Sequence, residues 1–124
     1  CGNVINPMIV EGQIVGGVAH GIGNALFEKL LFDESGQPLT TSFADYLLPM
    51  ATDVPNVETL HTETPSPLNP IGVKGAGEGG TIAVIAAIIS AVEDALRPFN
   101  ARLTQMPISP EKIVQIVLDA KGKQ

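Results

Sequence analysis

The sequence predicts an α+β fold in which three helices pack on a mostly antiparallel sheet. Apolar residues recur at helical spacing in three segments, and shorter alternating or turn-flanked apolar segments lie between them. Proline and glycine separate these segments. At 124 residues the chain has the size of one domain, so we expect residues 1–124 to form a single domain.

The composition excludes several classes of function. Charged residues make up only 16% of the chain, against about a quarter in typical domains, so we expect other protein to cover part of its surface. A net charge of −6 argues against nucleic-acid binding. No apolar stretch reaches the roughly 18 residues needed to span a bilayer, and the single cysteine fits a reducing compartment. We therefore expect a cytoplasmic protein that binds no membrane, and one cut from a longer chain because it begins at Cys1.

The first predicted helix runs from Met8 to Leu31, after a strand end and a turn at Asn6-Pro7. Five glycines interrupt it, and each costs a helix interior about 1 kcal/mol relative to alanine. Gly12 and Gly16 lie one turn apart, as do Gly17 and Gly21, so they leave shallow strips on the helix surface. Either another helix or a flat cofactor could lie on these strips.

The predicted sheet draws on three later segments. Residues 31–41 read as a hairpin, residues 55–65 alternate as in a strand, and residues 102–107 suggest a further short strand. His61, in the second of these segments, is expected to face solvent or a hydrogen-bond partner. A proline cluster follows this segment and makes the chain rigid and extended before a glycine-rich stretch. The cluster consists of Pro65, Pro67 and Pro70.

Two more helices are predicted in the second half of the chain. Residues 81–97 are apolar on nearly every face, and a helix that is hydrophobic all round is usually buried. Pro98 ends this helix. Ser109 and Pro110 suit the N-cap and first position of a third helix, which has an apolar face.

The glycine loop, residues 72–81, is the main candidate site. It places five glycines around Glu78 and leads directly into the second predicted helix. Glycine lets a ligand approach the main chain closely, and a helix N-terminus favours negative charge. Glu78 is therefore a candidate catalytic base. The alternative is a glycine-rich turn whose glutamate only caps the helix.

Other site chemistries fit the sequence less well. Residues 75–80 match the GxGxxG pattern of dinucleotide-binding proteins, but residues 67–71 do not form the buried strand that should precede it. No Gly-Lys-Ser/Thr closes a phosphate-binding loop, and the histidines and Cys1 lack metal-ligand spacing. We therefore predict no metal-ligating residue. The remaining candidates are Glu78 and Gln13, which lies between the glycine strips.

Three motifs carry a resemblance to the molybdenum hydroxylases, in which they occur in this order and at similar spacing. They are Cys1-Gly2-Asn3-Val4-Ile5-Asn6-Pro7, Glu11-Gly12-Gln13-Ile14-Val15-Gly16-Gly17 and Gly72-Val73-Lys74-Gly75-Ala76-Gly77-Glu78. The family includes the large subunits of xanthine dehydrogenase, aldehyde oxidase and carbon monoxide dehydrogenase. The resemblance covers essentially the whole chain, which looks like the C-terminal part of the molybdopterin-binding domain in bacterial members.

This resemblance implies a role for each candidate residue. Glu78 would be the active-site glutamate, which takes a proton from the metal-bound hydroxide or water during oxidation of a substrate. Gln13 would hydrogen-bond the pterin, and Lys74, Gly75, Ala76 and Gly77 would line the pocket. The cofactor would be molybdopterin with molybdenum, in the cytosine dinucleotide form usual in bacterial relatives. Iron–sulfur clusters and FAD would lie in partner subunits or domains.

The family's active site also needs earlier loops of the large subunit, which this chain lacks. We therefore expect the remainder of that subunit to complete the cofactor site and the isolated chain to be inactive. A fragment, a split-gene subunit and a relic all stay open, as do homo-oligomerisation and the substrate. Two other functions also stay open: a non-catalytic assembly module and a nucleotide-binding glycine-loop domain.

Overall fold

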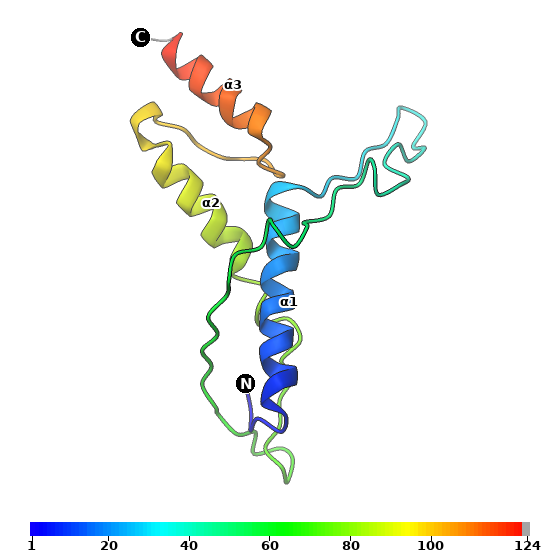
Figure 1. Cartoon of the computed structure of the whole chain (residues 1–124), viewed down its shortest axis with the longest axis vertical. Helices are drawn as coiled ribbons and strands as arrows, with labels where there is room; N and C mark the ends of the chain where they lie inside the picture. Colours follow the sequence, from blue (N-terminus) through cyan, green and yellow to red (C-terminus); the bar gives the residue numbers. More distant parts are fainter. Residues whose placement is uncertain (123–124) are drawn as a thin grey trace.

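The structure is a computed structural model that describes residues 1–122, and its regular elements are helices (Figure 1). They are α1 (Pro7–Leu26), α2 (Val84–Ala95), the short 3-10 helix η1 (Arg97–Phe99) and α3 (Pro110–Lys121). A long irregular connection joins α1 to α2. None of the helices in this part of the chain has the length and apolar character needed to cross a membrane.

The predicted α+β fold with an antiparallel sheet is wrong, because residues 1–122 contain no β-strand. The predicted hairpin at residues 31–41 does turn back on itself, but its pairing is limited to one β-bridge between Phe32 and Pro38. Residues 55–65 run alongside α1 (Figure 1) without a partner strand. Alternation predicts an extended backbone, and a strand also needs a neighbour that pairs at successive residues. Residues 102–107 and the segment before Asn6 likewise form no strand.

The first helix begins one residue before the predicted start at Met8, because the predicted turn at Asn6-Pro7 is its cap and first residue, and it ends early. Asn6 is its N-cap, with Oδ1 accepting a hydrogen bond from the Ile9 N–H at 3.2 Å, and Pro7 is the first helical residue. The helix was expected to reach Leu31 but ends at Leu26. The Gly23 carbonyl accepts hydrogen bonds from the N–H groups of Phe27 and Glu28, the two residues that follow the helix. The chain turns away from the helix axis there.

The second helix has a shorter span and less cover than predicted. It starts at Val84 instead of Thr81 and ends at Ala95, and none of its residues is buried. It packs on α1 near its first turn, where a Cβ atom at Gly21 would lie 2.6 Å from the Val84 Cβ. The expected burial of this helix is therefore absent, because α1 covers only one side of it.

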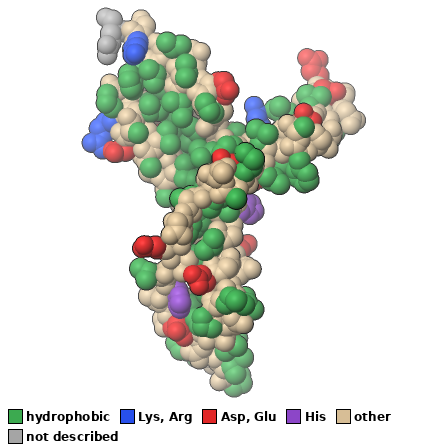
Figure 2. Space-filling model, viewed as in Figure 1, with side chains coloured by type: hydrophobic (Ala, Val, Ile, Leu, Met, Phe, Trp, Pro, Cys, Tyr) green, Lys and Arg blue, Asp and Glu red, His purple; other side chains and the backbone are tan. Residues whose placement is uncertain are grey.

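A small apolar core holds the two halves of the chain together. Its buried hydrophobic residues are Ile22, Ala25, Leu96 and Ile108. The Ile108 N–H donates to the Ala25 carbonyl at 2.7 Å, which ties the segment before α3 to the end of α1. Ser109 is the N-cap of α3, as predicted, and accepts a hydrogen bond from the Lys112 N–H. Many large apolar side chains stay exposed, and Figure 2 shows apolar side chains across the part of this face that contains α2 and α3.

Candidate functional site

The glycine loop lies along α1, and its end is in backbone contact with that helix (Figure 1). A Cβ atom at Gly80 would lie 2.4 Å from the Ile14 carbonyl oxygen, and one at Gly17 would lie 2.8 Å from the Gly80 carbonyl carbon. Real Cβ atoms do not approach other atoms this closely, so the contact requires glycine. The predicted strip of Gly17 and Gly21 therefore packs against the loop end and the start of α2.

The other predicted strip faces open space. Cβ atoms at Gly12 and Gly16 would meet no other atom within 4 Å, and the same holds for Gly75 and Gly79 in the glycine loop. These four positions leave the main chain of α1 and of the loop open to a ligand.

The structure brings Gln13 and the glycine loop together, as the predicted site requires. A Cβ atom at Gly77 would lie 3.6 Å from the Gln13 Oε1, and the Gln13 side chain is exposed. Its amide can therefore donate to one partner and accept from another. Lys74 and Glu78 are also exposed, and within residues 1–122 neither side chain makes a hydrogen bond or an ion pair.

The main chain of the glycine loop is rich in free donors. Within the described residues, no backbone N–H group from residue 74 to residue 80 donates a hydrogen bond to the protein. The Glu78 carbonyl accepts from the N–H groups of Thr81 at 3.0 Å and Ile82 at 3.3 Å, so a turn separates Glu78 from α2. The glycine loop was expected to end at a helix N-terminus near Thr81, but α2 begins at Val84, six residues after Glu78. The turn, not the helix end, therefore holds Glu78.

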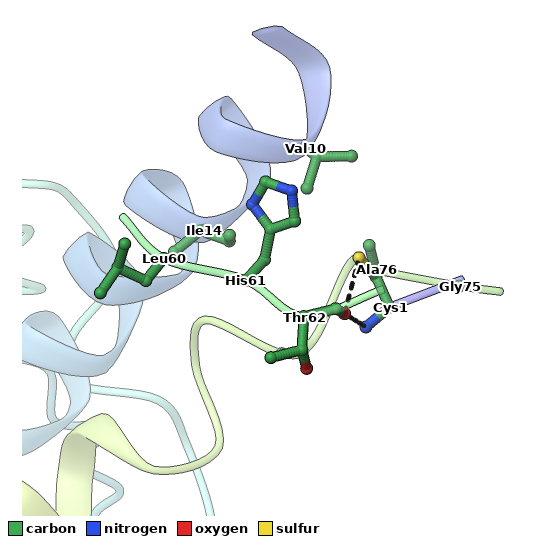
Figure 3. A pocket seen from close by; sticks show the side chains of 9 residues that line it. Cys1, Val10, Ile14, Leu60, His61, Thr62, Gly75 and Ala76 are labelled. Atoms are coloured by element: carbon green, nitrogen blue, oxygen red, sulfur yellow. Dashed lines mark hydrogen bonds between the residues drawn. The ribbon is translucent and has the colours of Figure 1, made fainter. Parts of the chain in front are cut away.

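A cavity of about 430 Å³ opens between α1, residues 60–62 and the glycine loop. Gly75, Ala76 and Gly79 form one wall, and Val10 and Ile14 of α1 lie on another. Figure 3 shows the His61 ring pointing from the extended segment towards α1. The Cys1 thiol and amino group both donate to the Thr62 carbonyl beside it, at 3.5 and 3.1 Å.

His61 is exposed, as predicted, and it also lines this cavity, which was not predicted. Alternation along residues 55–65 could not place it, because the other wall comes from the glycine loop, more than ten residues later. The sequence feature that could have placed His61 near the loop is the proline cluster between residue 61 and the glycine loop, which turns the chain back towards α1. In residues 1–122, no group of three or more His, Cys, Asp or Glu side chains could hold a metal ion.

A separate polar contact lies beyond the C-terminal end of α1. The Tyr46 hydroxyl donates to the Glu28 carboxylate, and this hydrogen bond raises the pKa of Tyr46. A Cβ atom at Gly23 would lie 2.2 Å from the Glu28 Oε1, so a side chain at position 23 would displace the Glu28 carboxylate. This contact belongs to the helix end and not to the glycine loop.

Comparisons with known proteins agree on one family of proteins. Residues 1–55 match a family model described as a molybdopterin cofactor-binding domain. The whole chain is 50% identical, over 127 residues, to 16% of the nicotine 6-hydroxylase large subunit of Paenarthrobacter nicotinovorans. It is 44% identical over 107 residues to the carbon monoxide dehydrogenase large chain of Afipia carboxidovorans, an alignment that includes 86% of this chain and 13% of the relative.

The solved structures give the same result. Quinoline 2-oxidoreductase from Pseudomonas putida superposes with a TM-score of 0.90 and 48% identity, over 96% of this chain and 15% of that one. The chain therefore spans about one sixth of the length of the relatives that it matches.

Proposed function

Because this chain belongs to the molybdenum hydroxylase family, we propose that it forms the C-terminal part of a molybdopterin-binding large subunit and supplies the active-site base Glu78. The main support is the placement of Gln13 beside the glycine loop, since two motifs more than 60 residues apart meet there. Residues 1–124 then act as one domain of that subunit, and the rest of the subunit completes the site.

The residues present fit a molybdopterin cofactor. A pterin offers hydrogen-bond donors and acceptors, which the exposed Gln13 amide can match. The open positions at Gly12, Gly16, Gly75 and Gly79 leave room for a flat ring system or a phosphate close to the main chain. The free N–H groups of residues 74–80 suit anionic or carbonyl oxygens. In this proposal Lys74, Gly75, Ala76 and Gly77 line the pocket.

Glu78 would act as a general base. When bound, the molybdenum cofactor supplies the two-electron oxidation of the substrate carbon. The Glu78 carboxylate is exposed and has no partner in residues 1–122, so it is free to accept a proton at the reacting centre. The turn at residues 78–82 orders the backbone on its C-terminal side.

The remaining parts of the enzyme would lie outside this chain. The cofactor would carry the cytosine dinucleotide form, and iron–sulfur and flavin subunits would take the electrons away. The relatives include a large subunit and a large chain of such enzymes, which favours an assembly of several polypeptides. We also propose an N-heteroaromatic substrate, because nicotine 6-hydroxylase and quinoline 2-oxidoreductase are 50% and 48% identical to this chain.

The alternative of a nucleotide-binding domain is not favoured. A dinucleotide-binding glycine loop follows a buried strand, and no strand precedes the glycine loop within residues 1–122. A non-catalytic assembly role remains the competing proposal.

Substitution of Glu78 in the intact enzyme tests the proposed function. Glu78→Gln keeps the shape of the side chain and removes the base, so turnover of quinoline or nicotine should fall roughly 10²- to 10⁴-fold. Molybdenum content should stay at the wild-type level. Glu34→Gln is the matched control, since Glu34 is an exposed acid in the turn of residues 33–37, outside the glycine loop. Unchanged turnover in Glu78→Gln, with normal molybdenum content, would favour the assembly role instead.

A further inference from the structure

We propose that Asn69 and Asn3 are positioning residues, whose hydrogen bonds set the direction in which the glycine loop leaves the proline cluster and thereby the place of Glu78. This inference rests on the proposed function of Glu78 and deepens it. Neither asparagine lines the cavity next to the loop. Their effect on chemistry would pass through the main chain.

Asn69 holds both backbone polar groups of Val73. Its Oδ1 accepts the Val73 N–H at 2.9 Å, and its Nδ2 donates to the Val73 carbonyl at 2.9 Å. The Asn69 carbonyl also accepts the Gly72 N–H at 3.2 Å. The carboxamide donates from Nδ2 and accepts at Oδ1 at the same time, and the pair of bonds fixes the orientation of Val73. Lys74 follows immediately and is the first residue of the glycine loop whose N–H donates no hydrogen bond within residues 1–122.

Asn3 holds the preceding residues from the other side. Its Nδ2 donates to the Ile71 carbonyl at 2.8 Å, and its backbone N–H donates to the Gly72 carbonyl at 3.0 Å. Gly72 has a φ of 67°, and a Cβ atom there would lie 2.8 Å from the Asn3 Nδ2. A Cβ atom at Gly2 would in turn lie 2.3 Å from the Gly72 carbonyl oxygen. The N-terminal segment therefore packs tightly on the start of the glycine loop.

These contacts matter because the rest of the loop has few restraints. Val73 is restrained by Asn69 at one end, and Gly80 is restrained by its contact with Ile14 at the other. Between them, the N–H groups of residues 74–80 make no hydrogen bond within the described residues. The position of Glu78 therefore depends on both ends. A displacement of about 1 Å can cost on the order of 10²-fold in rate.

The test compares substitutions of the two asparagines in the intact enzyme that contains this chain. Asn69→Ala removes both bonds to Val73, Asn69→Asp keeps an acceptor for the Val73 N–H, and Asn3→Ala removes the bond to Ile71. Gln115→Ala is the matched control, because it removes one side-chain hydrogen bond, to Asp119, on the exposed surface of α3. The readouts are hydrogen exchange of the Val73 amide, molybdenum content, melting temperature, and kcat and KM for quinoline or nicotine.

We expect Asn69→Ala to speed exchange of the Val73 amide and to lower kcat on the order of 10- to 100-fold, with KM, molybdenum content and melting temperature near wild type. Asn69→Asp and Asn3→Ala should fall between Asn69→Ala and wild type, and Gln115→Ala should match wild type. Faster exchange with unchanged kcat would overturn the proposal. So would a loss of kcat in proportion to molybdenum content. An inactive, molybdenum-free wild type would instead overturn the proposed function on which the inference rests.

Discussion

Gly80 and Ile14 are in such close contact that a Cβ atom at position 80 would come within 2.4 Å of the Ile14 carbonyl oxygen. The contact joins the end of the glycine loop to α1, one residue after Gln13. Two backbones approach each other here with no side chain between them. The distance between the two predicted halves of the site therefore depends on glycine at position 80.

Gly80→Ala should loosen the junction between the glycine loop and α2. The added methyl group cannot fit without moving Ile14, so local opening at Thr81 to Val84 should become easier by about 1–3 kcal/mol. Hydrogen exchange of the Thr81, Ile82 and Val84 amides in the intact subunit measures this, since all three donate hydrogen bonds in the turn. Gly122→Ala is the control outside the site, because a Cβ atom there would make only an ordinary contact, 3.6 Å from the Leu118 carbonyl oxygen. Equal exchange in the two variants would contradict the prediction.

Two glycines of α1 should respond to alanine in opposite directions. Gly16 faces open space, so Gly16→Ala should stabilise the helix by about 1 kcal/mol through helix propensity alone. Gly21→Ala gains the same propensity but drives a methyl group into Val84, 2.6 Å away, and should displace α2. Hydrogen exchange of the α1 amides in the cofactor-free intact subunit compares them. Slower exchange in Gly21→Ala than in Gly16→Ala would show that this packing contact is wrong.

The turn at Asp33 should weaken in acid. The Ser35 hydroxyl donates to Asp33 at 2.7 Å, and the backbone N–H groups of Gln37 and Ser35 donate at 2.9 and 2.8 Å. The Ser35 hydroxyl, followed by the Gln37 N–H, holds the pKa of Asp33 below its ordinary value of 3.8. The ionised carboxylate therefore stabilises the turn fully above its ordinary pKa of 3.8. This stabilisation is lost as the pH falls through the lower pKa of the folded chain.

An NMR titration of the Asp33 carboxyl carbon checks this direction. Ser35→Ala removes the largest contribution, so the pKa of Asp33 should rise towards its ordinary value. An unchanged midpoint in that variant would mean that the hydroxyl contributes nothing.

The 124-residue chain on its own should behave as a loosely packed state. Its buried hydrophobic core consists of Ile22, Ala25, Leu96 and Ile108, while Leu60 and Leu68 are 96% and 92% exposed. We expect helical far-UV circular dichroism, strong binding of the dye ANS and a broad thermal transition. The intact subunit is the comparison, and it should bind much less dye per chain. A sharp transition without dye binding would contradict this expectation.

The sequence predicted helix ends best where a capping residue marks them. Ser109, followed by Pro110, caps α3 as expected, whereas Asn6-Pro7 was predicted as a turn and is instead the N-cap and first residue of α1. Periodicity predicted all three helices but extended the first to Leu31, because the following apolar residues continue the pattern after the turn at Gly23. The sheet was wrong because alternation predicts an extended chain and says nothing about its partner.

The candidate site could be predicted only in part. Its glycines and Gln13 were identified from their motifs, and the structure places Gln13 beside Gly77. His61 was not assigned to the cavity, since its neighbours there come from α1 and the glycine loop. The roles of Asn3 and Asn69 could not be predicted, because each depends on a hydrogen bond to backbone whose direction the sequence does not specify.

Three helices, the N-cap of α3, the glycine loop and the family could be recognised from the residues alone, because propensity, capping and motif order act over short stretches of chain. Tertiary packing sets which glycines make contact and which stay open, since Gly17 and Gly16 are neighbours with opposite environments. It also decided that the glycine loop lies against α1, with Gly80 on Ile14. The reason is physical: contact between two backbones depends on the path of the whole chain between them.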